Sequence, residues 1–176
     1  MKLNLFGLLT LVTAAFLAGN APALPEPKVI EVGDNVPEFC WTDVHDMKLC
    51  HPTFVNTVRV LIYGTGWCPD CNKEMAAIVA RVNTYKDKAV TFISLSAQGD
   101  LAGAPPTLEF LKTWKERHQI PFYVAASPRD AGKNFFAPPI YIPNVVIIGR
   151  DNRLVYKAVS PSVDEIFAEI KKALGE

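Results

Sequence analysis

Two cysteines separated by two residues stand where an apolar, β-rich run gives way to a helical pattern, and this junction limits the fold more than any other feature. Residues 58–63 predict a buried strand, and the glycine-containing segment 64–66 ends it. Within residues 71–85, apolar side chains recur at helical spacing and form one apolar face. Cys68 and Cys71 are therefore expected in a strand–loop–helix unit, with Cys68 at the N-terminus of the helix.

The position of Cys68 determines its expected chemistry. Unpaired backbone N–H groups and the helix dipole stabilise a thiolate at a helix N-terminus, and in C-x-x-C settings the thiol pKa can fall well below the free value of about 8.5. We therefore predict that Cys68 is the nucleophile and that Cys71 is the buried resolving thiol, which attacks a mixed disulfide and releases the partner. Pro69 suits the first helical turn, whereas the charge of Asp70 opposes thiolate formation.

Three other uses of this motif remain open from the residues alone. C-x-x-C is also the spacing of half a zinc site, although a closed site needs a second pair, and Cys40 with Cys50 has a poor spacing for one. Thr65 and Cys68 match a peroxidase-like T-x-x-C pattern, but the apolar Trp67 and a nearby resolving cysteine favour disulfide exchange. A chaperone or copper-delivery protein would use the cysteines as ligands. We predict no metal and no cofactor besides the redox-active disulfide.

Strands and helices alternate along the remainder of the chain. We expect strands at 39–42, 47–51, 90–95 and 122–125, helices at 106–118 and 127–136, a hairpin of strands at 145–148 and 154–158, and a closing helix at 162–174. This succession predicts an α/β fold in which a mixed central sheet is flanked by helices.

The N-terminus has the composition of an export signal. Lys2 precedes an apolar run at residues 3–18, and small residues follow up to Ala23. The apolar run is shorter than the roughly 20 residues of a transmembrane helix. We therefore expect cleavage before Leu24, which leaves a soluble protein in the periplasm or another exported compartment. An uncleaved N-terminal membrane anchor is the alternative.

The chain of 176 residues, 49% of them hydrophobic, has enough material for one domain with a core. We assign residues 1–23 to the signal peptide, residues 24–35, which include two prolines, to an extended linker, and residues 36–176 to the domain. Lys and Arg together number 18, as do Asp and Glu, so the chain lacks the excess positive charge that nucleic acids attract. We expect a monomer that does not bind nucleic acid.

With these features, the chain resembles the thioredoxin superfamily and, within it, the exported TlpA/ResA-like thiol–disulfide oxidoreductases. The resemblance covers about residues 36–174. It rests on the initial hairpin, the W-C-P-D-C motif, Glu74 and Met75 directly after it, the extra helix and strand at 106–125, and the pair Ile142-Pro143 ahead of the last hairpin. It implies a thioredoxin fold with an N-terminal β-hairpin and a TlpA/ResA-like central insertion.

The resemblance also implies a substrate-binding site around one proline. In this family the proline that matches Pro143 is cis and packs beside the active-site disulfide, and the backbone before it binds the substrate chain. A cis X-Pro bond is uncommon enough to indicate a purpose. Carried over to this chain, Ile142 and Pro143 bind the substrate together with Trp67, Pro69 and Asp70. A strand-edge proline is the alternative interpretation of Pro143.

Two positions depart from the family pattern, and a third matches it. Ile62 stands where many relatives have a buried acid, so the usual base for the resolving cysteine is missing. Ala76 replaces a proline that commonly kinks the active-site helix, which predicts a straighter helix here. Glu74 matches a family position and is a candidate accessory acid. A solvated or helix-capping carboxylate is the alternative interpretation of Glu74.

The resemblance implies an enzyme that exchanges thiols and disulfides with partner proteins. We expect a reductase that acts on substrates such as apocytochromes during cytochrome c maturation and is recharged by a membrane electron donor. Reduction, oxidation and isomerisation use the same dithiol. A disulfide-donating oxidase and an isomerase therefore remain alternatives.

The other two cysteines form a second candidate pair, because an oxidising compartment permits disulfides. If the turn between their strands is centred on His45, antiparallel pairing sets Cys40 opposite Cys50 and predicts a structural disulfide. A shift of one residue would point the two side chains to opposite faces of the sheet. A second redox relay, a metal cluster with His45 and His51, and two free thiols remain open.

Overall fold

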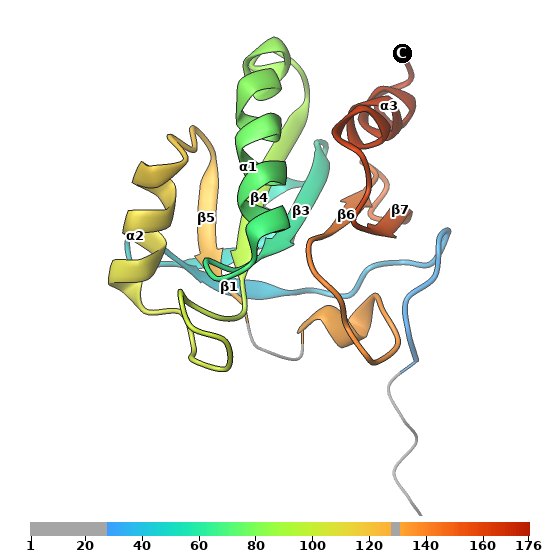
Figure 1. The fold of residues 1–176 in the computed structure, drawn as a ribbon. Coiled ribbons are helices and arrows are strands. Elements are labelled where there is room, and N and C mark those ends of the chain that lie inside the picture. Colours follow the sequence, from blue (N-terminus) through green and yellow to red (C-terminus); the bar gives the residue numbers. More distant parts are fainter. Residues whose placement is uncertain (1–27, 128–130) are drawn as a thin grey trace, which may run out of the picture.

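The computed structural model of the chain describes residues 28–127 and 131–176. The expected signal peptide, residues 1–23, and the first part of the expected linker lie outside the described residues. The described part forms a sheet of seven strands in the order β2-β1-β5-β4-β3-β6-β7. Helices pack against this sheet (Figure 1).

The sheet is mixed, as predicted. Its strands are β1 (Cys40–Asp43), β2 (Lys48–Cys50), β3 (Val58–Gly64), β4 (Val90–Ser96), β5 (Tyr123–Ala126), β6 (Asn144–Ile148) and β7 (Leu154–Val159). β3, β4 and β5 are parallel, whereas the β1–β2 and β6–β7 hairpins add antiparallel strands on either side. Because parallel strands end at the same edge of a sheet, the loops after β3, β4 and β5 lie together there.

The described residues form three α-helices, α1 (Pro69–Val82), α2 (Leu108–Arg117) and α3 (Val163–Leu174), and three short 3-10 helices, η1 (His51–Phe54), η2 (Asn83–Tyr85) and η3 (Ala131–Asn134). Side chains of all three α-helices join one hydrophobic cluster with the sheet. In Figure 1, α1 stands between α2 and α3 on this face. None of these helices has the length and apolar character needed to cross a membrane.

β3 is buried at every position, because both of its faces are covered. Val60 and Ile62 point into the cluster that the three α-helices share. Leu61 and Tyr63, on the opposite face, pack in a second cluster with Phe135. Alternating side chains of a strand reach opposite faces, and burial on both faces explains why this strand is apolar at nearly every position.

The segment 127–136 differs from the prediction of a short helix. Its described part contains only the single 3-10 turn η3, and residues 128–130 lie outside the described residues. The backbone N–H of Ser127 donates to the Ser96 carbonyl at 2.9 Å. Ser127 therefore continues the pairing between β4 and β5.

The described part of the expected linker is packed against the domain. The backbone N–H of Ile30 donates to the Asn134 carbonyl at 2.7 Å, and the Lys157 ammonium donates to the Ile30 carbonyl at 2.9 Å. Ile30 and Val36 are buried in the second cluster. Because these apolar side chains add to the core, the described chain is packed against the domain from at least Ile30 onward.

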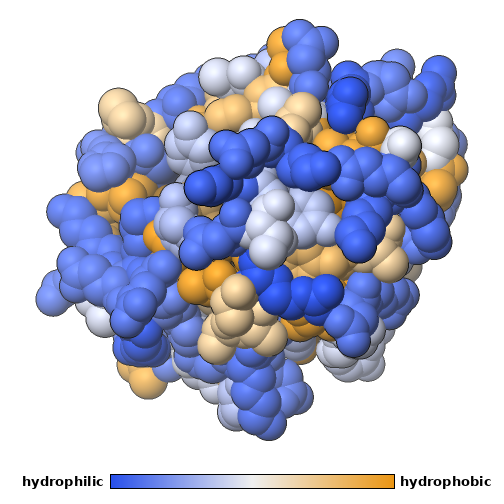
Figure 2. Space-filling model, turned by 90° about the horizontal axis from the view of Figure 1, so that it is seen from above, coloured by the Kyte–Doolittle hydropathy of each residue, from blue (hydrophilic) through white to orange (hydrophobic). Residues whose placement is uncertain are grey.

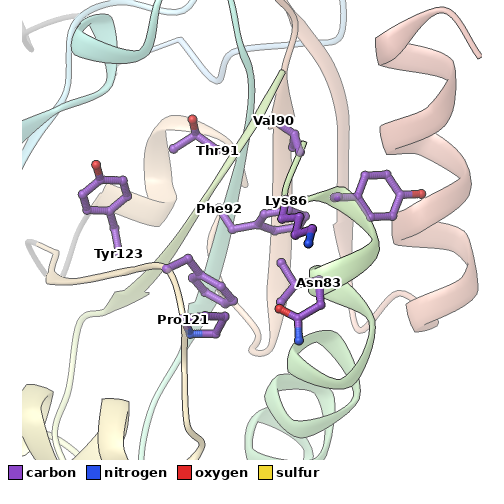
Figure 3. A pocket seen from close by; sticks show the side chains of 10 residues that line it. Asn83, Lys86, Val90, Thr91, Phe92, Pro121 and Tyr123 are labelled. Carbon is purple, nitrogen blue, oxygen red and sulfur yellow. The ribbon is translucent and has the colours of Figure 1, made fainter. Parts of the chain in front are cut away.

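The end of the molecule that carries the C-terminus shows no large apolar patch. Figure 2 views this end from above, and its hydrophobic residues form small patches between hydrophilic ones. A pocket of about 250 Å³ lies where α1 gives way to η2 and β4 begins, lined by residues such as Asn83, Lys86, Val90 and Pro121 (Figure 3). β3 and β4 begin near this pocket and end at the opposite edge of the sheet. The pocket is therefore remote from Cys68 and Cys71.

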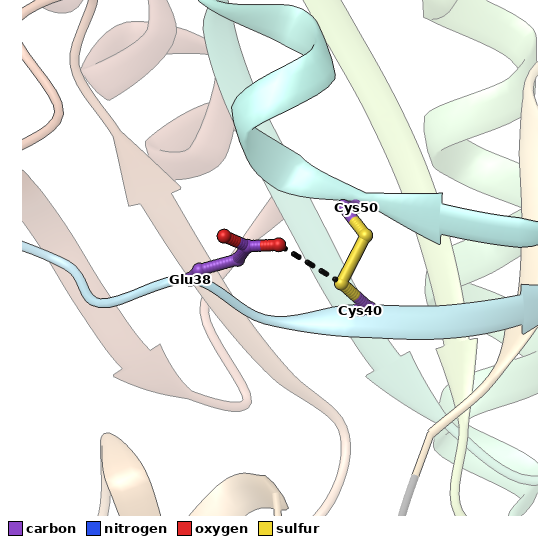
Figure 4. A group of neighbouring side chains, drawn as sticks. All are labelled: Glu38, Cys40 and Cys50. Carbon is purple, nitrogen blue, oxygen red and sulfur yellow. Dashed lines mark hydrogen bonds between the residues drawn. A yellow bond between two sulfur atoms is a disulfide. The ribbon is translucent and has the colours of Figure 1, made fainter.

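The first hairpin contains a disulfide between Cys40 and Cys50, whose Cα atoms lie 4.0 Å apart (Figure 4). The predicted register, with Cys40 opposite Cys50 and Trp41 opposite Leu49, is confirmed. The Glu38 carboxylate lies 3.4 Å from Cys40 Sγ. Since a disulfide sulfur carries no proton, this approach is a contact without a hydrogen bond.

Removing this crosslink should destabilise the domain. The two cysteines are 10 residues apart, and the chain-entropy relation gives about 2.7 kcal/mol for a loop of this size. We therefore expect Cys40→Ala combined with Cys50→Ala to lower the free energy of unfolding by about that amount, as measured by urea denaturation. In excess reductant the difference should vanish, because the wild-type disulfide is then also broken. A difference that persists there would assign the loss to packing.

Candidate redox site

Cys68 lies at the junction of the β3 loop and α1, as predicted. It is the N-cap residue of α1, with extended backbone angles of φ −88° and ψ 112°, and its Sγ accepts a hydrogen bond from the Cys71 backbone N–H at a distance of 3.1 Å. Pro69 follows as the first helical residue, where its missing N–H removes no helical bond. A sulfur in this position receives both an unpaired N–H and the positive end of the helix dipole.

Cys68 and Cys71 are joined in a disulfide, with Cα atoms 5.3 Å apart. Both residues are buried, at 5% and 3% exposure. Gly64 lies against the second cysteine so closely that a Cβ on this glycine would stand 3.2 Å from Cys71 Cβ. The end of β3 therefore holds Cys71 against the sheet, as a buried resolving thiol requires.

The loop between β3 and α1 is fixed by the loop that follows β4. Trp67 is 42% exposed, and its indole N–H donates to Gln98 Oε1 at 3.1 Å. The Gly66 N–H donates to the Gly99 carbonyl at 3.2 Å. A Cβ at Gly66 would collide with the side chain of Asp100 and with the ring of Phe110 in α2. The indole therefore sits at the surface in a defined orientation beside the disulfide.

Asn72 and His118 connect the redox loop to α2, and sequence reasoning gave neither of them a role. Asn72 Nδ2 donates to the carbonyls of Gly66, at 3.0 Å, and Cys68, at 2.8 Å. His118 Nε2 lies 3.0 Å from Asn72 Oδ1. Burial lowers the pKa of His118, with the Arg117 charge adding to the effect. No sequence signal indicates this contact, because it depends on how α1 and α2 pack.

Ile142 and Pro143 lie at the same edge of the sheet as the disulfide. The peptide bond between them is cis, Pro143 is buried, and its carbonyl accepts from the Ser160 N–H at 2.9 Å. The next residue, Asn144, pairs with Tyr63 in β3. The sequence-predicted proline therefore stands beside the end of β3, where the redox loop begins.

Asp70, the charged member of the predicted substrate-binding set, forms an ion pair within α1. Its carboxylate lies 3.2 Å from the Lys73 ammonium, and both side chains are more than three-quarters exposed. Exposed ion pairs of this kind contribute little to stability. Asp70 is therefore free to exchange this partner for another at the surface.

Glu74 is buried, which contradicts its interpretation as a solvated or capping carboxylate. It is 8% exposed, and its Oε1 has no hydrogen-bond partner among the residues that the structure describes. Burial raises the pKa of Glu74 to about 7. Ile62, at the position of the missing acid, is 2% exposed in the same hydrophobic cluster as Met75. Glu74 is therefore an acid with a pKa suited to proton transfer near neutral pH.

A second pocket, of about 290 Å³, lies beside the disulfide and is lined by Trp67, Gln98 and Ile142 among others. Thr65 and Asn144 also line it, and Thr65 Oγ1 and Asn144 Oδ1 are buried without a hydrogen-bond partner in the described part of the chain. Tyr63 lines it too, and burial raises the pKa of its phenol. The redox site thus has an adjoining hollow.

The described residues contain one group of three potential metal ligands, Glu38, Cys40 and Cys50. The two sulfurs are bonded to each other and so are not the thiolates that bind a metal. His51, considered above as a further ligand, is fully buried, and its Nε2 lies 2.7 Å from the Pro37 carbonyl. Burial lowers the pKa of His51. This histidine therefore has a structural partner in the segment that precedes β1.

Comparison with known proteins agrees with this architecture. The model of a family described as AhpC/TSA matches residues 32–157. The chain belongs to the AhpC/TSA family. This AhpC/TSA protein is 25% identical over 148 residues to the thiol–disulfide oxidoreductase ResA of Bacillus thuringiensis subsp. konkukian, an alignment that covers 82% of the chain and 79% of the relative.

Solved structures of low sequence identity share the fold of the AhpC/TSA chain. The thioredoxin domain of a thiol–disulfide oxidoreductase from Bacteroides vulgatus has a TM-score of 0.67 at 16% identity, over 82% of this chain and 99% of that one. A secreted disulfide oxidoreductase of Mycobacterium tuberculosis, homologous to DsbE of E. coli, has a TM-score of 0.61 at 16% identity, over 76% and 95%. The predicted thioredoxin fold and superfamily resemblance are confirmed, and these relatives belong to the enzyme class predicted from the motif.

Proposed function

We propose that the protein is an exported thiol–disulfide oxidoreductase that reduces disulfides in partner proteins through Cys68 and Cys71. The observation that carries the proposal is the disulfide at the start of α1, with the Cys71 N–H directed at Cys68 Sγ at 3.1 Å. A backbone N–H and the helix dipole stabilise the Cys68 thiolate once the pair is reduced. The same disulfide favours exchange over the peroxidase-like use of Thr65 and Cys68.

In the proposed reaction, two electrons pass from the reduced pair to the partner. The Cys68 thiolate attacks one sulfur of the partner disulfide, a mixed disulfide forms, and the other partner sulfur leaves as a thiolate. The Cys71 thiolate then attacks Cys68 Sγ and displaces the second partner sulfur. The partner thiolates take up two protons in total, and the protein is left with the Cys68–Cys71 disulfide. No cofactor is required by this sequence of steps.

Glu74 is proposed as the accessory acid of the second step. It lies one helical turn after Cys71 on α1, and burial brings its pKa to about 7. A carboxylate with this pKa accepts a proton from the resolving thiol at neutral pH and can then release it to solvent. Glu74 would thereby replace the acid that Ile62 displaces.

The proposed partner-binding surface surrounds the disulfide. Trp67 is partly exposed, and Tyr141, just before Ile142 and Pro143, is 62% exposed. Exposed aromatic side chains beside a reactive sulfur are typical of protein docking surfaces. Pro69 and Asp70, at the start of α1, complete this surface. The partners would be proteins that carry thiols or disulfides, and apocytochromes are the candidate class.

Export of the protein is supported by the composition of residues 1–23. It is also supported by the second disulfide, Cys40–Cys50, because the cytosol keeps such pairs reduced. One structural relative is described as secreted. We propose a monomer in the periplasm or a comparable compartment, soluble after cleavage before Leu24, with a membrane protein as electron donor. Retention of the N-terminal segment as a membrane anchor is the alternative.

The reduction potential of the Cys68–Cys71 pair tests the proposed direction of electron flow. We expect a value near that of thioredoxin, about −270 mV, when the purified protein is equilibrated in graded thiol buffers and its alkylated cysteines are counted by mass. Cys40→Ala combined with Cys50→Ala provides the matched control, because it leaves only the redox pair to be counted. A value near −120 mV, as in a strong oxidant, would instead identify a disulfide donor.

A further inference from the structure

We propose that Asn72 and His118 are positioning residues of the redox site, which hold the loop before α1 in the geometry that stabilises the Cys68 thiolate. This inference rests on the proposed function of Cys68 as the attacking thiol. Neither residue belongs to the C-x-x-C motif or to the docking surface described above. Their effect would be exerted through backbone carbonyls and not through contact with the partner.

Asn72 fastens the redox loop to the first turn of α1. Its side-chain amide donates one N–H to the Gly66 carbonyl and one to the Cys68 carbonyl, at 3.0 and 2.8 Å. The Cys68 carbonyl also accepts the Asn72 backbone N–H at 3.2 Å. The backbone on both sides of Trp67 is therefore tied to one side chain. Loss of that side chain would release the loop that presents the sulfur.

His118 fixes the orientation of this amide. Because both N–H groups of Asn72 donate to carbonyls, its Oδ1 must accept, so His118 Nε2, at 3.0 Å, is the donor. The imidazole is held by Trp114, whose ring centroid lies 4.2 Å away, and by its place at the C-cap of α2. The C-terminal end of α2 thus orients the hydrogen bonds that Asn72 makes at the start of α1.

The network lowers the pKa of the Cys68 thiol in two ways. The thiolate is stabilised by the Cys71 N–H only while the loop holds Sγ at the helix N-terminus. The amide donors also engage the carbonyls of Cys68 itself and of Gly66, two residues before it, whose oxygens carry partial negative charge. Releasing Asn72 would weaken the stabilisation by the Cys71 N–H. It would also leave the negative charge of the two carbonyl oxygens uncompensated. Both changes raise the pKa of the Cys68 thiol.

Alkylation of reduced Cys68 as a function of pH tests the proposal. We expect Asn72→Ala and His118→Ala each to move the alkylation midpoint to higher pH, so that the rate with iodoacetamide at pH 6 falls about fivefold, the effect of one hydrogen bond. His118→Gln should restore the wild-type profile, because its side-chain amide can donate to Asn72 Oδ1. Cleavage before Asp70, which lies between the two cysteines, places Cys68 and Cys71 in separate peptides, and alkylation of the Cys68 peptide is quantified by mass.

An exposed histidine provides the matched control. His45 lies in the β1–β2 turn and is exposed, so His45→Ala should leave the alkylation profile unchanged. If His118→Ala lowers the melting temperature but leaves the profile of Cys68 at its wild-type position, the residue is only structural and the inference is overturned. A wild-type Cys68 that titrates near the free value of about 8.5 would instead count against the proposed function itself.

Discussion

A Cys71→Ala variant should remain covalently attached to disulfide-containing partners, whereas the wild-type protein should release them. In the variant, Cys68 still attacks the partner disulfide, but the intramolecular attack that resolves the mixed disulfide is lost. Proximity gives such intramolecular steps effective concentrations on the order of 10⁵ M or more, so external thiols replace the step poorly. We expect adducts of the reduced variant with an oxidised model peptide to persist at least about 1000 times longer than in the wild type.

The adducts are measured on non-reducing gels and by mass, with the peptide in excess. Cys68→Ala is the matched control, because it keeps Cys71, which the end of β3 covers at Gly64, and should form no adduct. Trapping by Cys68→Ala and not by Cys71→Ala would reverse the assigned roles. The absence of adducts in both variants would favour the ligand-binding chaperone over the enzyme.

The features that local pattern determines were predictable from the sequence. The junction of β3 with α1 follows from an apolar run, glycines and a helical repeat, and Ser162 caps α3 by accepting the Glu165 N–H at 3.1 Å. The pairing of Cys40 with Cys50 follows from the length of the turn between their strands. Helix and strand ends were misplaced by a few residues, because terminal turns are set by individual hydrogen bonds.

Features that depend on packing between distant segments were not predictable. The contact between Asn72 and His118 requires the C-terminal end of α2 to approach the N-terminal end of α1. The packing of Ile30 was missed because one apolar residue in a proline-containing stretch gives no periodic signal. The burial of Glu74 had a signal: it lies four residues before Ile78 and three after Cys71, on the face of α1 that packs on the sheet.

A Glu74→Gln variant should gain stability relative to the wild type as the pH rises. In the native protein burial raises the pKa of Glu74 from 4.5 to about 7, so between these values the native state holds a proton that the unfolded chain has released. The contribution of protonated Glu74 to the free energy of unfolding is fully present below pH 4.5 and is lost as the pH rises to about 7. The loss corresponds to about 3 kcal/mol, and glutamine, which does not titrate, avoids it.

We therefore expect the difference in unfolding free energy between Glu74→Gln and the wild type to grow by about 2 to 3 kcal/mol from pH 5 to pH 8. Urea denaturation of the oxidised proteins measures it without titration of the cysteines. Glu116→Gln, at an exposed position of α2, should give a small difference at both pH values. A constant difference for Glu74→Gln would mean that the carboxylate is already ionised at pH 5 despite its burial. A carboxylate of such low pKa would be too weak a base to take the proton from Cys71 efficiently, and the accessory role would then fall to another group.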